Sequence, residues 1–147
     1  MWSSKQEKEG LPMKMFLCAV IGFLCATAVP VFAQEPIDGS KPLICATVEA
    51  ITCSRGEPCE KGLPEDMGAP QFMRIDFSKK EIVGSRLTTP IRMMEIDNLQ
   101  ITLQGFELGM GWTMVIDRAT GRTSITLTGR DETYVIFGTC IPTNWGE

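Results

Sequence analysis

The chain has 147 residues with 18 acidic and 14 basic side chains, six cysteines and no histidine. This acidic balance, without a basic stripe, gives no electrostatic reason to bind nucleic acid or an anionic membrane. The absence of histidine excludes Ser-His-Asp and Cys-His catalysis, together with zinc hydrolases that use histidine ligands.

The first 33 residues are expected to form a signal peptide. A lysine, Lys14, precedes an apolar stretch over residues 15–29, and Pro30 ends that stretch. Residues 31–33 (Val-Phe-Ala) then place small or aliphatic side chains where a signal peptidase reads them. The stretch is shorter than the roughly 20 apolar residues of a spanning helix, so cleavage before Gln34 is expected.

Two other features of the leader refine this prediction. Residues 1–12 are polar and mixed in charge, which indicates a gene-model extension before a true start at Met13. Cys18 and Cys25 each follow a leucine, whereas a lipoprotein signal has a small residue there, so lipid attachment is not expected. Membrane contact is expected only through the signal segment before cleavage.

Cleavage would leave residues 34–147, enough for one domain with a real core. The leader holds two acidic and three basic residues, so 16 and 11 remain and the exported charge is about −5. Residues 34–42 are polar and rich in proline and glycine, and are expected to be a flexible lead-in. Residues 43–147 are expected to form a single β-rich domain held by disulfides.

Four cysteines remain after cleavage, namely Cys45, Cys53, Cys59 and Cys140. An even number in a small exported domain predicts two disulfides, with three possible pairings. The close spacing of Cys53 and Cys59 suggests a local loop. Cys45 would then pair with Cys140, joining the first strand to the last and stabilising the fold by roughly 4 kcal/mol. A zinc site is the rival interpretation, disfavoured by the lack of histidine and of a C-x₂-C pair.

Alternating and β-rich segments after residue 42 predict an all-β fold. Residues 43–52 form the first expected strand, with Ile44, Ala46, Val48 and Ala50 on one face. Residues 53–70 contain three glycines and three prolines, so an irregular loop is expected there. Further strands are expected at residues 73–77, 81–83, 91–96, 99–103, 112–116, 123–128 and 133–140.

The segments between these strands predict hairpins. Asp97-Asn98 suits a tight turn, after which Leu99, Ile101 and Leu103 would share one face. Residues 117–121 form a second hairpin loop, with Gly121 where a positive φ is needed. The predicted fold is a single small antiparallel meander of about seven or eight strands, either a closed barrel or a sandwich. A bridge from first strand to last would favour closure, because it would bring the two edges together.

Few residues suggest chemistry. Glu107 and Asp117 flank the strand of Trp112, and a glycosidase needs two carboxylates roughly 5 to 10 Å apart, although exposed carboxylates are ordinary in an acidic domain. Residues 103–112 contain three glycines, but a strand follows where a phosphate loop needs a helix. A turn is therefore expected there, with Trp112 packed inward beside Met114 and Ile116.

Clustered methionines can hold Cu(I) in exported proteins, and the candidates are Met93, Met94, Met110 and Met114. Methionine is also an adaptable core residue, which explains this spacing more simply, so no metal or cofactor is expected. Arg118, Arg122 and Arg130 fall on turns or strand ends near Asp117 and Asp131. They are either a solvated rim or possible recognition turns.

Several short motifs over most of the exported chain carry a resemblance. They are Leu43-Ile44-Cys45-Ala46, Cys53, Cys59, Ala69-Pro70-Gln71-Phe72, Arg74-Ile75-Asp76-Phe77, Leu103-Gln104-Gly105, Gly111-Trp112, Thr120-Gly121 and Phe137-Gly138-Thr139-Cys140. In these the chain resembles small exported β-rich proteins of proteobacterial type, which implies a periplasmic origin and assigns no activity. A looser likeness, in fold alone, is to periplasmic inhibitors of lysozyme.

The expected function is therefore non-catalytic: a periplasmic or secreted domain that binds another protein or a small envelope ligand through its turns. One alternative is a hydrolase of envelope glycans that uses a carboxylate pair. Another is a barrel that carries a small apolar ligand, which would need an interior cavity.

Overall fold

The computed structural model describes residues 36–143, which form ten strands in one antiparallel sheet. The strands are β1 (Leu43–Ser54), β2 (Glu60–Gly62), β3 (Phe72–Asp76), β4 (Glu81–Val83), β5 (Thr88–Pro90), β6 (Met93–Ile96), β7 (Gln100–Glu107), β8 (Met110–Asp117), β9 (Arg122–Thr128) and β10 (Glu132–Pro142). A short 3₁₀ turn, η1 (Pro64–Met67), follows β2. The expected signal peptide and its gene-model extension lie outside the described residues. Within the described range, no helix has the length and apolar character to cross a membrane.

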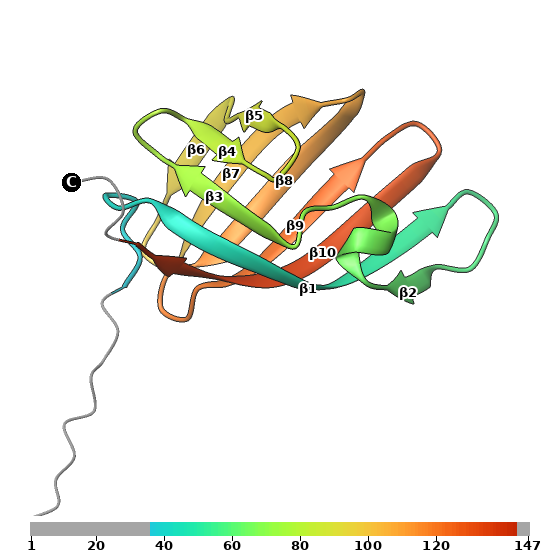
Figure 1. The fold of residues 1–147 in the computed structure, drawn as a ribbon, viewed down its shortest axis with the longest axis horizontal. Coiled ribbons are helices and arrows are strands. Elements are labelled where there is room, and N and C mark those ends of the chain that lie inside the picture. Colours follow the sequence, from blue (N-terminus) through green and yellow to red (C-terminus); the bar gives the residue numbers. More distant parts are fainter. Residues whose placement is uncertain (1–35, 144–147) are drawn as a thin grey trace, which may run out of the picture. The chain divides into compact units, whose positions relative to one another are not determined.

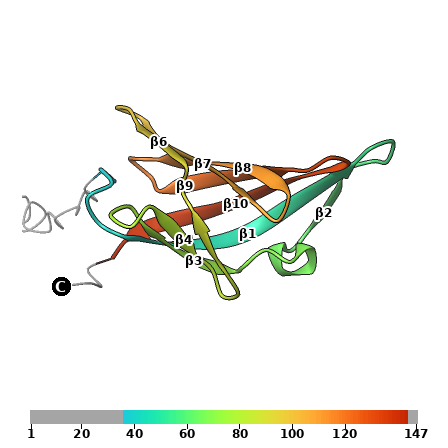
Figure 2. The same cartoon turned by 90° about the horizontal axis from the view of Figure 1, so that it is seen from above.

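The chain builds the sheet outward from its middle (Figure 1). From β1 it runs through β3 and β4 to the edge strand β5, continues as β6 at the opposite edge, and returns through β7, β8 and β9 to β10 beside β1. Nine strands follow this path, β2 pairs with β1, and the sheet curls into a half-barrel. Figure 2 shows β7 and β8 lying across from β1 and β3. The predicted antiparallel all-β fold is confirmed, as one curled sheet rather than a two-sheet sandwich.

The two edges of the sheet are joined by the chain itself. Only Ile91 and Arg92 separate β5 from β6. The N–H of Ile91 donates to the Lys80 carbonyl at 2.8 Å, and the N–H of Arg92 donates to the Gln104 carbonyl at 2.8 Å. This stretch therefore passes from beside β4 to beside β7. The prediction that the first and last strands are the edges is wrong, because β1 and β10 pair with each other inside the sheet.

A bulge in β1 changes which residues face the core. Leu43 and Cys45 are fully buried, whereas Val48 is 65% exposed. The register with β10 shifts between Thr47 and Glu49, so one extra residue reverses the alternation and Ala50 becomes buried. The predicted common face of Ile44, Ala46, Val48 and Ala50 is wrong for this reason.

The concave side of the sheet holds the core, with both disulfides attached to β1. Cys45 lies directly opposite Cys140 in β10, and the two form a fully buried disulfide. Cys53 and Cys59 form the second disulfide, across the loop between β1 and β2. The favoured pairing is confirmed. Two disulfides indicate an oxidising, extracytoplasmic environment.

Two local predictions needed correction. Residues 53–70 are not wholly irregular, because they contain β2 and η1, and β5 was not predicted at all. Leu99 does not share the buried face of Ile101 and Leu103 but is 77% exposed. The side chain of Asp97 accepts the N–H groups of Leu99 and Gln100 at 2.7 and 2.8 Å, which places Leu99 in the turn rather than in the strand.

Trp112 packs inward with 7% exposure, as predicted, and its indole lies over Gly105 on the neighbouring strand. A Cβ at Gly105 would fall 2.3 Å from Cζ2 of Trp112. Gly105→Ala is therefore expected to displace the indole and lower the free energy of unfolding by about 1–3 kcal/mol. Urea denaturation measures the loss, and the indole N–H resonance of Trp112 reports the displacement.

Gly111→Ala provides the matched control in the same hairpin, because a Cβ there meets no atom within 4 Å. Its effect is expected to stay within about 0.5 kcal/mol. Equal effects of the two substitutions would contradict this account of Trp112.

Candidate functional site

A groove on the outer face of the half-barrel is the candidate recognition site. Phe137 of β10 is opposite Ser124 of β9, which is opposite Val115 of β8. In the next row Asp117 is opposite Gln100. Side chains of these rows, together with Leu99 and Arg122, line a depression of about 460 Å³. We call it the outer groove: Leu99, Gln100, Val115, Asp117, Arg122 and Phe137.

The apolar side chains of the outer groove are open to solvent. Leu99 is 77% exposed and Phe137 is 39% exposed. Val48, next to the residue opposite Phe137, is 65% exposed and extends the apolar surface onto β1. Exposed apolar side chains bordered by polar groups are typical of surfaces that contact another molecule.

Asp117 and Arg122 supply the charges of the outer groove, and the turn between β8 and β9 brings them together. Oδ1 of Asp117 accepts the Thr120 N–H at 2.7 Å and the Thr120 hydroxyl at 2.8 Å. The Thr120 hydroxyl, then its N–H, lower the pKa of the Asp117 carboxyl, and the charge of Arg122 lowers this pKa further. The Asp117 side chain is thus fixed by its own turn, at the same end of the β8–β9 hairpin as Arg122.

Four aspartates hold turns in this way and make stability depend on pH. A Ser40 hydroxyl lowers the pKa of Asp38, a Ser78 hydroxyl that of Asp76, the Leu99 N–H that of Asp97 and the Thr120 hydroxyl that of Asp117. Because each pKa is lower in the folded chain, the unfolded chain binds more protons in acid. The contribution is complete above the unfolded value near 3.9 and is lost as the pH falls through the folded value.

The free energy of unfolding is therefore expected to fall with decreasing pH below about pH 4. A variant with asparagine at Asp38, Asp76, Asp97 and Asp117 is expected to show a shallower decrease, because these four groups no longer titrate. Urea denaturation between pH 2 and pH 7 measures both slopes. An unchanged slope in the fourfold variant would contradict the assignment.

The three arginines predicted as recognition turns do not gather at one place. Arg122 begins β9, at the outer groove, whereas Arg130 follows the other end of β9 and is exposed. Arg118 is half-buried, and its Nε donates to the carbonyl of Ile37 at 2.7 Å. Of the three, only Arg122 lines the outer groove.

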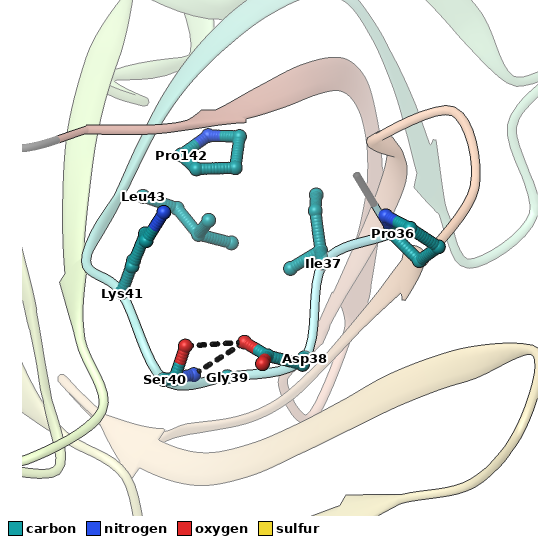
Figure 3. A pocket seen from close by; sticks show the side chains of 8 residues that line it. All are labelled: Pro36, Ile37, Asp38, Gly39, Ser40, Lys41, Leu43 and Pro142. Atoms are coloured by element: carbon teal, nitrogen blue, oxygen red, sulfur yellow. Dashed lines mark hydrogen bonds between the residues drawn. The ribbon is translucent and has the colours of Figure 1, made fainter. Parts of the chain in front are cut away.

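Arg118 instead ties residues 36–41 to the sheet, beside a small cavity of about 70 Å³. Figure 3 shows Ile37, Leu43 and Pro142 around this cavity, with Asp38 bonded to Ser40 below it. Ile37 is 3% exposed and joins the core. The described part of the segment that was expected to be a flexible lead-in is thus anchored to the core by Ile37. The polar composition of the segment gave no indication of this.

Glu107 and Asp117 are not brought together as a carboxylate pair. Glu107 is opposite Met110 at one end of β8, and Asp117 is at the other end. At about 3.3 Å per residue, these ends are roughly 23 Å apart, far beyond the glycosidase separation. Oε2 of Glu107 instead accepts the Thr89 hydroxyl at 3.3 Å. Residues 103–112 form a hairpin, with its turn at Leu108 and Gly109, as predicted.

The methionines also lie apart. Met114 is fully buried in β8, and Leu103 of β7 lies between it and Met94 of β6. Met93 is 55% exposed, and Met110 lies at the far end of β8. Over residues 36–143, no group of three or more Cys, Asp or Glu side chains is placed to hold a metal ion.

Leu99, Gln100, Val115 and Phe137 are the groove residues that the sequence analysis did not assign to a site. Phe137 could have been assigned to the outer face from strand alternation. Side chains alternate between the two faces of a strand, so the residue three positions before the inward-facing Cys140 lies on the outer face. Leu99 had a weaker signal. It follows Asp97-Asn98 directly, and its exposure depends on the hydrogen bond that the Asp97 side chain accepts.

The fold and the groove define a class: an extracytoplasmic all-β domain with a curled antiparallel sheet, two disulfides and a solvent-open groove on its outer face. No family model, curated protein or solved structure matches the chain.

Proposed function

We propose that this protein is a non-catalytic binding domain of the periplasm or the extracellular space, exported by a cleaved signal peptide, which recognises a partner protein through the outer groove. The observation that carries the proposal is the exposure of two apolar side chains, Leu99 on the β7 side of the groove and Phe137 on its β10 side, in a groove that Arg122 also lines. Interface cores are enriched in aromatic residues and arginine, and this groove supplies both.

The rigidity of the groove supports the same proposal. Except for Leu99, which lies in the turn before β7, its residues come from the neighbouring strands β7, β8, β9 and β10, and the buried disulfide fixes β10 to β1. A preorganised surface loses less entropy on binding. The concave side is occupied by side chains that include fully buried Ile101, Leu103 and Met114, which favours a surface site over an apolar carrier.

Photo-crosslinking in the exporting cell tests this function. A benzoylphenylalanine at Leu99 is expected to give a discrete adduct of higher mass, which mass spectrometry identifies as one protein. The same crosslinker at Thr128, an exposed position at the far end of β9, is the matched control and is expected to give none. Absence of an adduct at Leu99, or equal adducts at both positions, would overturn the proposal.

Arg122→Glu is expected to reduce the Leu99 adduct about tenfold, because it replaces the groove cation by an anion beside Asp117 and costs about 1.4 kcal/mol or more of binding. Arg130→Glu makes the same change of charge at the other end of β9 and is expected to leave the adduct unchanged. The adduct yield in the two variants, compared with wild type, measures the contribution of Arg122. Equal losses in both would show a general effect of net charge instead.

A further inference from the structure

Residues 36–41, which we call the strap, lie against one end of the half-barrel and bend at residues 39–41, where Gly39 has a φ of +82°. Ile37 is the strap residue that enters the core, at 3% exposure. Its N–H donates to the carbonyl of Arg118 at 2.8 Å, and its carbonyl accepts Nε of Arg118 at 2.7 Å. One aliphatic side chain and two backbone hydrogen bonds therefore hold the strap.

The strap has few other attachments. Within residues 36–143, every hydrogen bond from the strap to the sheet involves Arg118. Asp38 and Ser40 bond to each other instead, with the Ser40 hydroxyl donating to Asp38 at 2.6 Å. The cavity of about 70 Å³ beside Ile37 is lined mostly by residues of the strap itself, with Leu43 and Pro142 on the side of the sheet, so the strap does not pack closely along this end of the half-barrel (Figure 3).

The socket, by which we mean the place that the Ile37 side chain occupies, faces Leu43 and Pro142 of the sheet across the cavity. Ile96 lies next to Gly39 of the strap, where a Cβ would fall 2.9 Å from Cδ1 of Ile96. Arg118 is fixed independently, because its N–H donates to the Leu99 carbonyl at 2.9 Å and its guanidinium donates to the Asp97 carbonyl. Release of the strap would leave these groups positioned, with a free backbone acceptor and a free Nε donor.

We propose that this end of the half-barrel is a second binding site, for a short peptide segment with an aliphatic side chain, presented by another protein. The strap is then an internal occupant that such a segment displaces. The aliphatic side chain takes the place of Ile37, and the backbone N–H and carbonyl of its residue pair with Arg118. This site adjoins the outer groove, because the carbonyl of the groove residue Leu99 accepts the Arg118 N–H, but it uses none of the groove side chains and is tested independently of the function proposed above.

Tethering sets how the two occupants compete. A strap joined to β1 by a short linker has an effective concentration on the order of millimolar or higher. A free peptide with the same contacts therefore competes poorly with the intact strap. Ile37→Gly removes the side chain that fills the socket and keeps the tether, so a peptide added to this variant meets an unoccupied socket.

Nuclear magnetic resonance titration tests the site on labelled protein recovered from the export compartment. The probe is a blocked hexapeptide with the strap sequence, Pro-Ile-Asp-Gly-Ser-Lys. In the Ile37→Gly variant, it is expected to shift the amide resonances of Leu43, Leu99 and Arg118 saturably, with a Kd at least tenfold lower than for wild type. A peptide with aspartate in place of the isoleucine is expected to shift none of them.

Two outcomes would overturn the proposal. One is a well-dispersed spectrum of Ile37→Gly that does not respond to the hexapeptide. The other is an equal response to the aspartate peptide. Hydrogen exchange of wild type gives a second test that needs no variant: the Ile37 amide is expected to exchange at least tenfold faster than the slowest amides of β8. Exchange of Ile37 at the rate of β8 would show that the strap opens only on global unfolding, and would refute displacement.

Discussion

Replacing Cys45 and Cys140 together by alanine is expected to lower the free energy of unfolding by about 4.7 kcal/mol, since the disulfide spans 95 residues and a loop near 100 residues gives this value in the chain-entropy account. The disulfide restricts the unfolded chain across almost the whole domain. Both cysteines are also fully buried, so the substitutions leave a small void in the core. Urea denaturation under non-reducing conditions measures the loss.

The second disulfide supplies the matched control. Cys53 and Cys59 are six residues apart, and a loop of that length stabilises by only about 2 kcal/mol in the same account. Alanine at Cys53 and Cys59 removes the same bond chemistry from a partly exposed loop. Equal losses in the two double variants would show that loop length does not govern the effect.

Gly121→Ala is expected to lower the free energy of unfolding by about 3 kcal/mol or more, the sum of a backbone penalty and a steric one. Gly121 has a φ of +71°, which non-glycine residues adopt only with strain. A Cβ there would also lie 2.0 Å from the carbonyl oxygen of Cys140, a backbone atom of the adjacent strand that has no side-chain freedom. Thermal and urea denaturation of the purified variant measure the effect.

Gly56→Ala separates the two penalties. Gly56 has a similar φ of +80°, but a Cβ there meets no atom within 4 Å. Its loss is expected to be the strain alone, about 1–2 kcal/mol. If Gly121→Ala lowered the free energy of unfolding no more than Gly56→Ala does, the close approach of β10 to this turn would not contribute to the loss.

Much of the strand pattern could be predicted, because alternation and turn residues are local signals. Met73, Ile75 and Phe77 are buried as their spacing indicated. The loop that ends at Gly121 needed a positive φ, and the structure has one. The three-residue strands β2 and β5 were missed, whereas β4, of the same length, was predicted from its apolar β-branched residues Ile82 and Val83; β2 (Glu-Lys-Gly) and β5 (Thr-Thr-Pro) contain no such residue pair.

The faces of the strands were harder to predict than their positions. The bulge between Thr47 and Glu49 reverses the alternation of β1, and nothing in the local composition marks where a bulge falls. The exposure of Leu99 likewise depends on the Asp97 side chain in three dimensions. These two errors concern the outer surface, which is where the candidate site lies.

The sequence by itself determined the all-β class and most of the turn positions, and it favoured the observed pairing of the cysteines among three possible ones, because these follow from local side-chain chemistry and from spacing along the chain. The tertiary structure alone decided which residues share a site. Strand order placed Phe137, Val115 and Leu99 along one groove, and the length of β8 separated Glu107 from Asp117. It also docked Ile37 on Arg118, 81 residues away. Contacts of this kind depend on the register and the curvature of the sheet, which cannot be deduced from the order of residue types along the chain.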